Sequence, residues 1–228
     1  MIADCGHGNT RPAPAQPAPW LGNTPGDFSH SATYLRTAIM ISTMEKRYLV
    51  GQGELVLTVG DITRETTDAI ANAANAMLAG GGGVDGAIHR AAGPELLAAC
   101  QEVRKTLPSG RLAPGQAAAT PGFRLRAKHV IHCVGPIYDD DPATAPDKLG
   151  DCFRNALRIC RDLGLRSIAF PAISTGIYGY PLREAATVSL AAIQSDLLAH
   201  PQPELVKLVL FNEQTFQIFA AVADSQHS

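Results

Sequence analysis

The chain has 228 residues, of which 46% are hydrophobic and 18% charged, and its formal net charge is −2. This length fits one globular domain of ordinary size with an additional tail. The charge balance excludes a strongly basic protein that binds nucleic acid mainly by neutralising phosphates. No apolar run approaches the roughly 18–20 residues that cross a bilayer.

The first 30 residues are rich in proline and glycine and show almost no apolar periodicity. We predict a flexible N-terminal extension over residues 1–45 and a single domain over residues 46–228. Translation from Met44 is an alternative, because the first strand pattern follows it directly. Five cysteines without a C-x-x-C pair argue against a disulfide framework or a zinc knuckle. Since no secretory signal pattern is found, we expect a cytoplasmic protein.

Short apolar runs alternate with longer amphipathic segments after this extension. Strands are predicted over residues 48–50, 55–59, 69–72, 116–120, 129–134, 167–171 and 205–211. Helices are predicted over residues 85–105, 148–163, 182–198 and 213–222. This alternation predicts a three-layer α/β domain with a mostly parallel sheet. In such domains ligands bind at the carboxyl ends of the strands.

A glycine-rich loop, residues 80–86, lies between a predicted strand and a predicted helix. Consecutive glycines let backbone N–H groups approach a ligand closely. The start of a helix adds unpaired N–H groups and the positive end of a dipole, so the loop favours a phosphate. The alternative is a flexible surface loop in which Asp85 only caps its helix.

A second loop, residues 171–181, also connects a strand to a helix and contains two hydroxyl side chains, two glycines and tyrosine. It predicts a second phosphate-binding loop, with an ordinary surface connection as the alternative. Neither loop has the glycine pattern of a dinucleotide-binding Rossmann unit or of a Walker nucleotidase, which argues against both classes. Neither contains lysine, so we expect main-chain N–H groups to be the principal phosphate donors.

Four segments together resemble a macrodomain of the MacroD type. They are residues 60–63, residues 68–89 without positions 76, 77 and 79, residues 130–136 and residues 167–181, and the resemblance spans about residues 46–225. It implies an α/β/α sandwich with a mixed sheet, a pocket for ADP-ribose, and no metal or other cofactor. Members of this family hydrolyse the ester that links ADP-ribose to Asp or Glu side chains, and they deacetylate O-acetyl-ADP-ribose.

The resemblance also implies roles for individual residues. Asp61 would accept a hydrogen bond from the adenine amino group beside the Ile62 N–H, and Phe211 would stack on the base. Asn75 would hold the distal ribose, and Asp85 would orient or deprotonate a water molecule for attack at the anomeric side of that ribose. Further ligand contacts would come from Asn72, Gly82, Gly83, Val84, Gly86, Ser174, Thr175, Gly176, Ile177 and Tyr178.

Each assignment has a structural alternative. Asp61 or Asn75 would also suit a turn, and Phe211 would also suit the core. His89 and His132 are potential acids or bases near neutral pH. Both lie within patterned helix or strand segments, so we expect structural roles for them.

The predicted function is hydrolysis of mono-ADP-ribose esters on Asp and Glu side chains and of O-acetyl-ADP-ribose. One alternative is a reader that binds ADP-ribose without hydrolysis, and another is a phosphatase for ADP-ribose 1″-phosphate. An acid at Asp85 together with Asn75 favours the hydrolase, because binding alone does not need the acid. We expect a monomer that acts on ADP-ribosylated proteins, O-acetyl-ADP-ribose or ADP-ribosylated nucleic-acid ends, and not on membranes.

Overall fold

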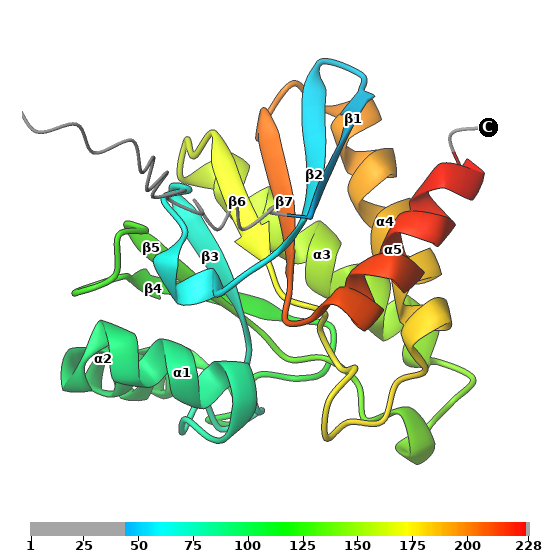
Figure 1. Cartoon of the computed structure of the whole chain (residues 1–228). Helices are drawn as coiled ribbons and strands as arrows, with labels where there is room; N and C mark the ends of the chain where they lie inside the picture. Colours follow the sequence, from blue (N-terminus) through cyan, green and yellow to red (C-terminus); the bar gives the residue numbers. More distant parts are fainter. Residues whose placement is uncertain (1–43, 227–228) are drawn as a thin grey trace, which may run out of the picture. The chain divides into compact units, whose positions relative to one another are not determined.

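The computed structural model describes residues 44–226, so the predicted N-terminal extension lies almost wholly outside the described residues. Seven strands form one sheet, with helices on both of its faces (Figure 1). The strands are β1 (Glu45–Val50), β2 (Gly53–Val59), β3 (Ala69–Ala73), β4 (Ala117–Pro121), β5 (His129–Cys133), β6 (Ser167–Phe170) and β7 (Leu205–Leu210). Their positions agree closely with the predicted ones.

The helices are α1 (Gly83–Ala92), α2 (Pro94–Thr106), α3 (Ala145–Asp162), α4 (Leu182–Ala199) and α5 (Glu213–Gln226). Two short 3-10 turns, η1 (Ile62–Arg64) and η2 (Tyr138–Asp140), follow β2 and β5. None of the helices between residues 44 and 226 is long and apolar enough to cross a bilayer.

The strand order in the sheet is β1-β2-β7-β6-β3-β5-β4. The five inner strands run parallel to one another, and only the edge strands β1 and β4 pair antiparallel. The predicted mixed, mostly parallel sheet is therefore confirmed. Parallel inner strands bring all their carboxyl ends to one edge of the sheet, which is where open α/β sheets bind ligands.

Side chains on the inner strands alternate between two hydrophobic cores, as the two-residue period of a strand requires. On β3, Ala69 and Ala71 belong to the core that also contains residues of α3, α4 and α5. Ile70, between them, belongs to the core that contains residues of α1 and α2. The sheet is thus covered on both faces, which explains why its inner strands are almost entirely apolar.

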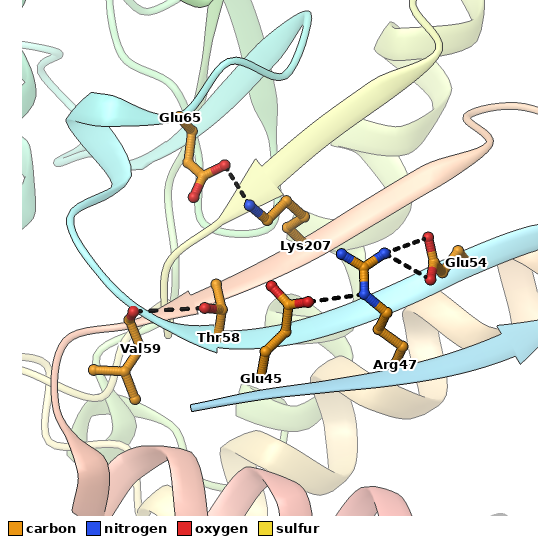
Figure 2. Close-up of polar contacts among 7 residues, drawn as sticks. All are labelled: Glu45, Arg47, Glu54, Thr58, Val59, Glu65 and Lys207. Carbon is orange, nitrogen blue, oxygen red and sulfur yellow. Dashed lines mark hydrogen bonds and ion pairs between the residues drawn. The ribbon is translucent and has the colours of Figure 1, made fainter. Parts of the chain in front are cut away.

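Charged side chains form ion pairs on and beside strands β1, β2 and β7 (Figure 2). The Arg47 guanidinium lies 2.8 Å from the Glu45 carboxylate and 3.0 Å from that of Glu54. Charge on an edge strand discourages pairing with another chain. Lys207 on β7 lies 2.6 Å from Glu65, the residue that follows η1, and both side chains are mostly buried. This pair ties the segment after β2 to the sheet.

The single helix predicted over residues 85–105 is wrong, because the structure has two helices there. Gly93 interrupts them with φ of 90°, a conformation that L side chains rarely adopt, and Pro94 starts the second helix. The first helix also begins earlier than predicted, at Gly83. The glycine-rich loop therefore continues directly into the first turn of α1.

Candidate functional site

A cavity of about 760 Å³ opens at the carboxyl ends of the parallel strands. Its volume lies within the range of small-molecule binding sites. The segments after β2, β3, β5, β6 and β7 and the start of α1 contribute its walls. The predicted site residues that line it are Asp61, Ile62, Asn75, Gly82, Gly83, Val84, Asp85, Ser174, Thr175, Gly176, Ile177, Tyr178 and Phe211.

Two predicted ligand contacts, Asn72 and Gly86, do not line the cavity. Asn72 is completely buried on β3, and its amide hydrogen-bonds to the Asp85 carboxylate instead. Gly86 is buried in the first turn of α1, where an added Cβ would lie 2.4 Å from the carbonyl oxygen of Gly81. Both residues therefore lie behind the cavity wall in this structure, and their predicted ligand contacts are not seen among its lining residues.

The first turn of α1 presents main-chain N–H groups at the cavity. Its first internal hydrogen bond runs from Gly86 N to Gly82 O, 3.1 Å, so the N–H groups of Gly83, Val84 and Asp85 precede the helical ladder. Gly82 is the N-cap residue and offers no side chain to them. Free N–H groups and the positive dipole end together suit an anionic ligand.

The Asp85 carboxylate lies in the wall of the cavity and is only 6% exposed. Its Oδ1 accepts a hydrogen bond of 2.7 Å from Asn72 Nδ2. His89 Nε2, one turn later on α1, lies 3.4 Å from the same oxygen but makes no hydrogen bond. The alternative in which Asp85 only caps its helix is wrong, because Gly82 occupies the cap position.

Gly81, which the sequence prediction omitted, borders both candidate catalytic groups. An added Cβ there would lie 3.1 Å from Asp85 Oδ2 and 3.8 Å from Asn75 Nδ2. The space above Gly81 is therefore the place where a ligand atom would meet both side chains. The run of consecutive glycines at residues 80–83 was visible in the sequence, but not which glycine faces the acid.

Asn75 makes the turn contacts of its structural alternative and also lines the cavity, as its predicted role requires. Its Oδ1 accepts from the N–H of Met77 at 3.0 Å, and its Nδ2 donates to the carbonyl oxygen of Gly80 at 2.8 Å. These bonds hold the turn that leads into the glycine-rich loop. Because an amide nitrogen carries two hydrogens, Nδ2 keeps one for a ligand in the cavity that it lines.

The loop after β6 forms the opposite wall, and its backbone is bent so that several N–H groups remain available. Ser174 is buried with a positive φ of 66°, and its carbonyl oxygen accepts from Tyr180 N at 3.0 Å. None of the N–H groups of residues 175–178 donates to a backbone carbonyl in the described part of the chain. Free N–H groups in a loop that lines the cavity suit phosphate oxygens.

Tyr178 belongs to this loop and lies near enough to Asp85 to interact with its charge. Partial burial and the nearby Asp85 carboxylate raise the pKa of Tyr178 above its usual value. The phenol therefore keeps its proton at neutral pH and remains a hydrogen-bond donor. Asp85 and Tyr178 lie in facing walls of the same cavity.

The far end of the cavity is formed by Asp61, Ile62 and Phe211. Asp61 Oδ1 accepts from the Thr63 hydroxyl at 2.7 Å and from its N–H at 3.0 Å, and these bonds lower the pKa of Asp61. Asp61 is thus a fixed, ionised acceptor. Phe211 follows β7 directly and is 91% exposed, so the alternative that it belongs to the core is wrong. An exposed aromatic face beside an acceptor suits a nucleobase.

Arg90 is a cavity residue that the sequence reading missed. Gly83, Ala87 and Arg90 occupy one face of α1 at the i, i+4, i+7 spacing, and all three line the cavity. A cation therefore supplements the main-chain donors. Extending the helix period from the glycine-rich loop would have found it.

His132 lies outside the cavity lining and is completely buried on β5. Burial lowers its pKa to about 3, so the ring is neutral at physiological pH. This agrees with the expected structural role rather than direct acid or base catalysis. Residues 44–226 contain no group of three or more His, Cys, Asp or Glu side chains placed to hold a metal ion.

Comparison with known proteins gives a consistent result. The family model described as "Macro domain" matches residues 71–189. An O-acetyl-ADP-ribose deacetylase of Cronobacter turicensis is 49% identical over 167 residues, which are 73% of this chain and 94% of the relative. The corresponding enzyme of Salmonella typhimurium is 46% identical over 73% of this chain and 92% of its own length.

Solved structures give the same picture. The Oceanobacillus iheyensis macrodomain with ADP is 46% identical, with a TM-score of 0.78, over 80% of this chain and 96% of its own. The Trypanosoma brucei macrodomain in complex with ADP-ribose is 38% identical, with a TM-score of 0.67, over 74% of this chain and 68% of its own.

Proposed function

Because this chain belongs to the macrodomain family, we propose that its cavity binds ADP-ribose and that it hydrolyses O-acetyl-ADP-ribose to acetate and ADP-ribose. Relatives named O-acetyl-ADP-ribose deacetylase support the reaction, and the ligands of the neighbouring structures support the binding site. We further propose that the ester of ADP-ribose with an Asp or Glu side chain of a protein is a substrate of the same site.

The adenine binds at the far end of the cavity in this proposal. Asp61 accepts from the exocyclic amino group, the Ile62 N–H donates beside it, and Phe211 stacks on the base. The exposed phenyl face of Phe211 and the ionised Asp61 carboxylate support this placement. The diphosphate lies between the start of α1 and residues 174–178, where main-chain N–H groups gather.

The distal ribose then lies at the Asp85 end. Asn75 donates to a ribose hydroxyl with its remaining amide hydrogen, and Asp85 orients or deprotonates a water molecule. Hydrolysis adds this water across the ester, so that the products are a carboxylate, a ribose hydroxyl and one proton. We place the attack at the anomeric carbon for the protein ester, where the carboxylate is the leaving group.

The observation that carries the proposal is the Asp85 carboxylate, which lies buried in the cavity wall with one oxygen held by Asn72. Its other oxygen, Oδ2, is the one that borders the space above Gly81. Binding of ADP-ribose alone does not require a buried acid at this position. A positioned general base of this kind contributes about 10²–10⁴-fold to a rate.

The test is release of acetate from O-acetyl-ADP-ribose, and of ADP-ribose from a glutamate-modified protein, by wild type beside Asp85→Asn. The asparagine can still accept from Asn72 through its carbonyl oxygen but cannot take a proton, so it isolates the chemical role. We expect ADP-ribose affinity to persist and turnover to fall. If the wild type binds ADP-ribose but hydrolyses neither ester, the protein is a reader. If it releases phosphate from ADP-ribose 1″-phosphate but hydrolyses neither ester, it is a phosphatase.

The site of attack has its own test. In ¹⁸O-water, attack at the anomeric carbon leaves the released carboxylate unlabelled, whereas attack at the acyl carbon labels it. A labelled glutamate carboxylate after removal of ADP-ribose would overturn the proposed attack at the ribose.

A further inference from the structure

A chain of buried polar side chains lies directly behind Asp85. Asn72 Nδ2 is 2.7 Å from Asp85 Oδ1 and 3.1 Å from His132 Nδ1. His132 Nε2 lies 3.0 Å from Thr120 Oγ1 on the next strand, and also 3.5 Å from Cys100 Sγ on α2. Asn72, Thr120, His132 and Cys100 are all buried, so this chain links the cavity wall to the core.

Strand pairing explains why these residues meet. Asn72 and His132 are paired in register across the parallel strands β3 and β5. Both lie two residues after a member of the core beneath α1 and α2, Ile70 and Val130 respectively. Their side chains therefore leave the same face of the sheet side by side.

The hydrogen positions in this chain follow from its chemistry. An amide nitrogen donates two hydrogen bonds, and here one goes to the Asp85 carboxylate and the other to His132 Nδ1. His132 Nδ1 must therefore be unprotonated, so the neutral ring carries its proton on Nε2 and donates it to Thr120. The reversed amide would turn the Asn72 oxygen toward the carboxylate, where two acceptors would repel.

We propose that Asn72 and His132 are positioning residues that hold the Asp85 carboxylate in its reactive orientation. His132 fixes the direction of the Asn72 amide, and that amide holds Oδ1 of Asp85, which leaves Oδ2 to face the space above Gly81. The inference rests on the proposed function, because it assumes that Asp85 acts on the water. Neither residue touches the ligand, since neither lines the cavity.

The other groups around Asp85 do not replace this support. His89 Nε2 lies 3.4 Å from Oδ1 but makes no hydrogen bond. The pKa of Cys100 is raised to about 11, chiefly by burial, so its sulfur is an uncharged thiol. Tyr178 lies near Asp85 in the opposite loop, on the ligand side. Asn72 is thus the side chain that hydrogen-bonds to the carboxylate from the core side.

The test compares two substitutions of His132 by kcat and KM for O-acetyl-ADP-ribose. His132→Leu removes the acceptor, whereas His132→Asn can place an amide oxygen where Nδ1 was. We expect His132→Leu to lower kcat about 10-fold with KM within about 2-fold of wild type, because a small misplacement of a catalytic group is costly. His132→Asn should recover most of kcat. Ser189→Ala on α4, equally buried but outside this chain, should keep wild-type kcat.

A double-mutant cycle separates positioning from a general effect on the fold. In the Asp85→Asn background, assayed at high enzyme concentration, His132→Leu should cause no further loss of kcat, because the group that it positions is already disabled. The proposal is overturned if His132→Leu keeps wild-type kcat, or if it loses the same factor in both backgrounds.

Failure of the proposed function would appear differently, as a wild-type protein that releases no acetate. In that case the crystal structure of His132→Leu decides the inference. Rotation of the Asn72 amide and displacement of the Asp85 carboxylate would support it, and an unchanged Asp85 would overturn it.

Discussion

The two ends of the cavity differ in how firmly their side chains are held. At the proposed adenine end, Phe211 is 91% exposed, and within residues 44–226 the Asp61 carboxylate is hydrogen-bonded by Thr63 alone and approached by Arg64. At the reaction end, Asp85 is 6% exposed and is tied through Asn72 to the core. The proposed recognition thus relies on exposed side chains held only by local contacts, whereas the proposed chemistry relies on a side chain that the buried sheet holds in place.

The largest expected effect falls at the reaction end. Asp85→Ala should lower kcat for O-acetyl-ADP-ribose by about 10²–10⁴-fold, because the water loses its base. Calorimetric titration should find ADP-ribose affinity within a few-fold of wild type. An affinity loss as large as the rate loss would show that Asp85 binds the ligand rather than acting on water, and the contrast between the two ends would fail.

Phe211→Ala tests the other end. Stacking of a base on an aromatic ring is worth about 1–3 kcal/mol, so the Kd for ADP-ribose should rise about 5- to 160-fold. The midpoint of thermal unfolding should stay unchanged, because the side chain is almost fully exposed. A drop in the unfolding midpoint without a change in Kd would contradict the assignment of this residue to the base.

Gly81→Ala addresses the space between Asp85 and Asn75. The added methyl would sit 3.1 Å from Asp85 Oδ2, so we expect kcat to fall about 10-fold through displacement of the acid or the water. Gly82→Ala is the control for the effect of replacing a loop glycine on stability, because an added Cβ there meets no atom within 4 Å. Equal kcat for Gly81→Ala and wild type would exclude this space as the place of reaction.

Acid should destabilise the reaction end through His132. Its pKa falls from 6.5 to about 3 on folding, so above pH 6.5 the ring is neutral in both states and has no effect. Below pH 6.5 the imidazole of His132 is protonated in the unfolded chain but stays neutral in the folded chain. The free energy of unfolding therefore falls by up to about 1.4 kcal/mol per pH unit until about pH 3. Urea unfolding from pH 7 to pH 4 should show a shallower decline for His132→Asn than for wild type.

Much of the fold was predictable because the sheet is covered on both faces. Apolar strands such as β6 and the regular helix period of α3 follow directly from burial. The break at Gly93 was not predicted, because the apolar period continues across it and only the backbone conformation separates the two helices. The sequence did contain a signal for this break, because Gly93 is followed directly by Pro94.

The site was predictable where it depends on backbone and loops, and less so where it depends on side-chain direction. Residues 81–85 of the glycine-rich loop and residues 171–178 of the second loop do line one cavity. Asn72 was assigned to the ligand by the family resemblance, yet its side chain is buried against Asp85 whereas Asn75 lines the cavity. Only the register of β3 against β5 shows that Asn72 points to His132.

The register between β3 and β5 matters for the proposed activity as well as for the fold. A slip of β3 by one residue against β5 would turn Asn72 to the other face of the sheet and leave an alanine beside His132. Alanines flank Asn72 on both sides, so the exchange beside His132 itself removes little apolar contact, although Ile70 would also leave its core. The acid would lose the Asn72 hydrogen bond, which is the one that a sheet side chain makes to it in the described part of the chain. Turnover is therefore a more sensitive reporter of correct strand pairing in this protein than compactness or helix content.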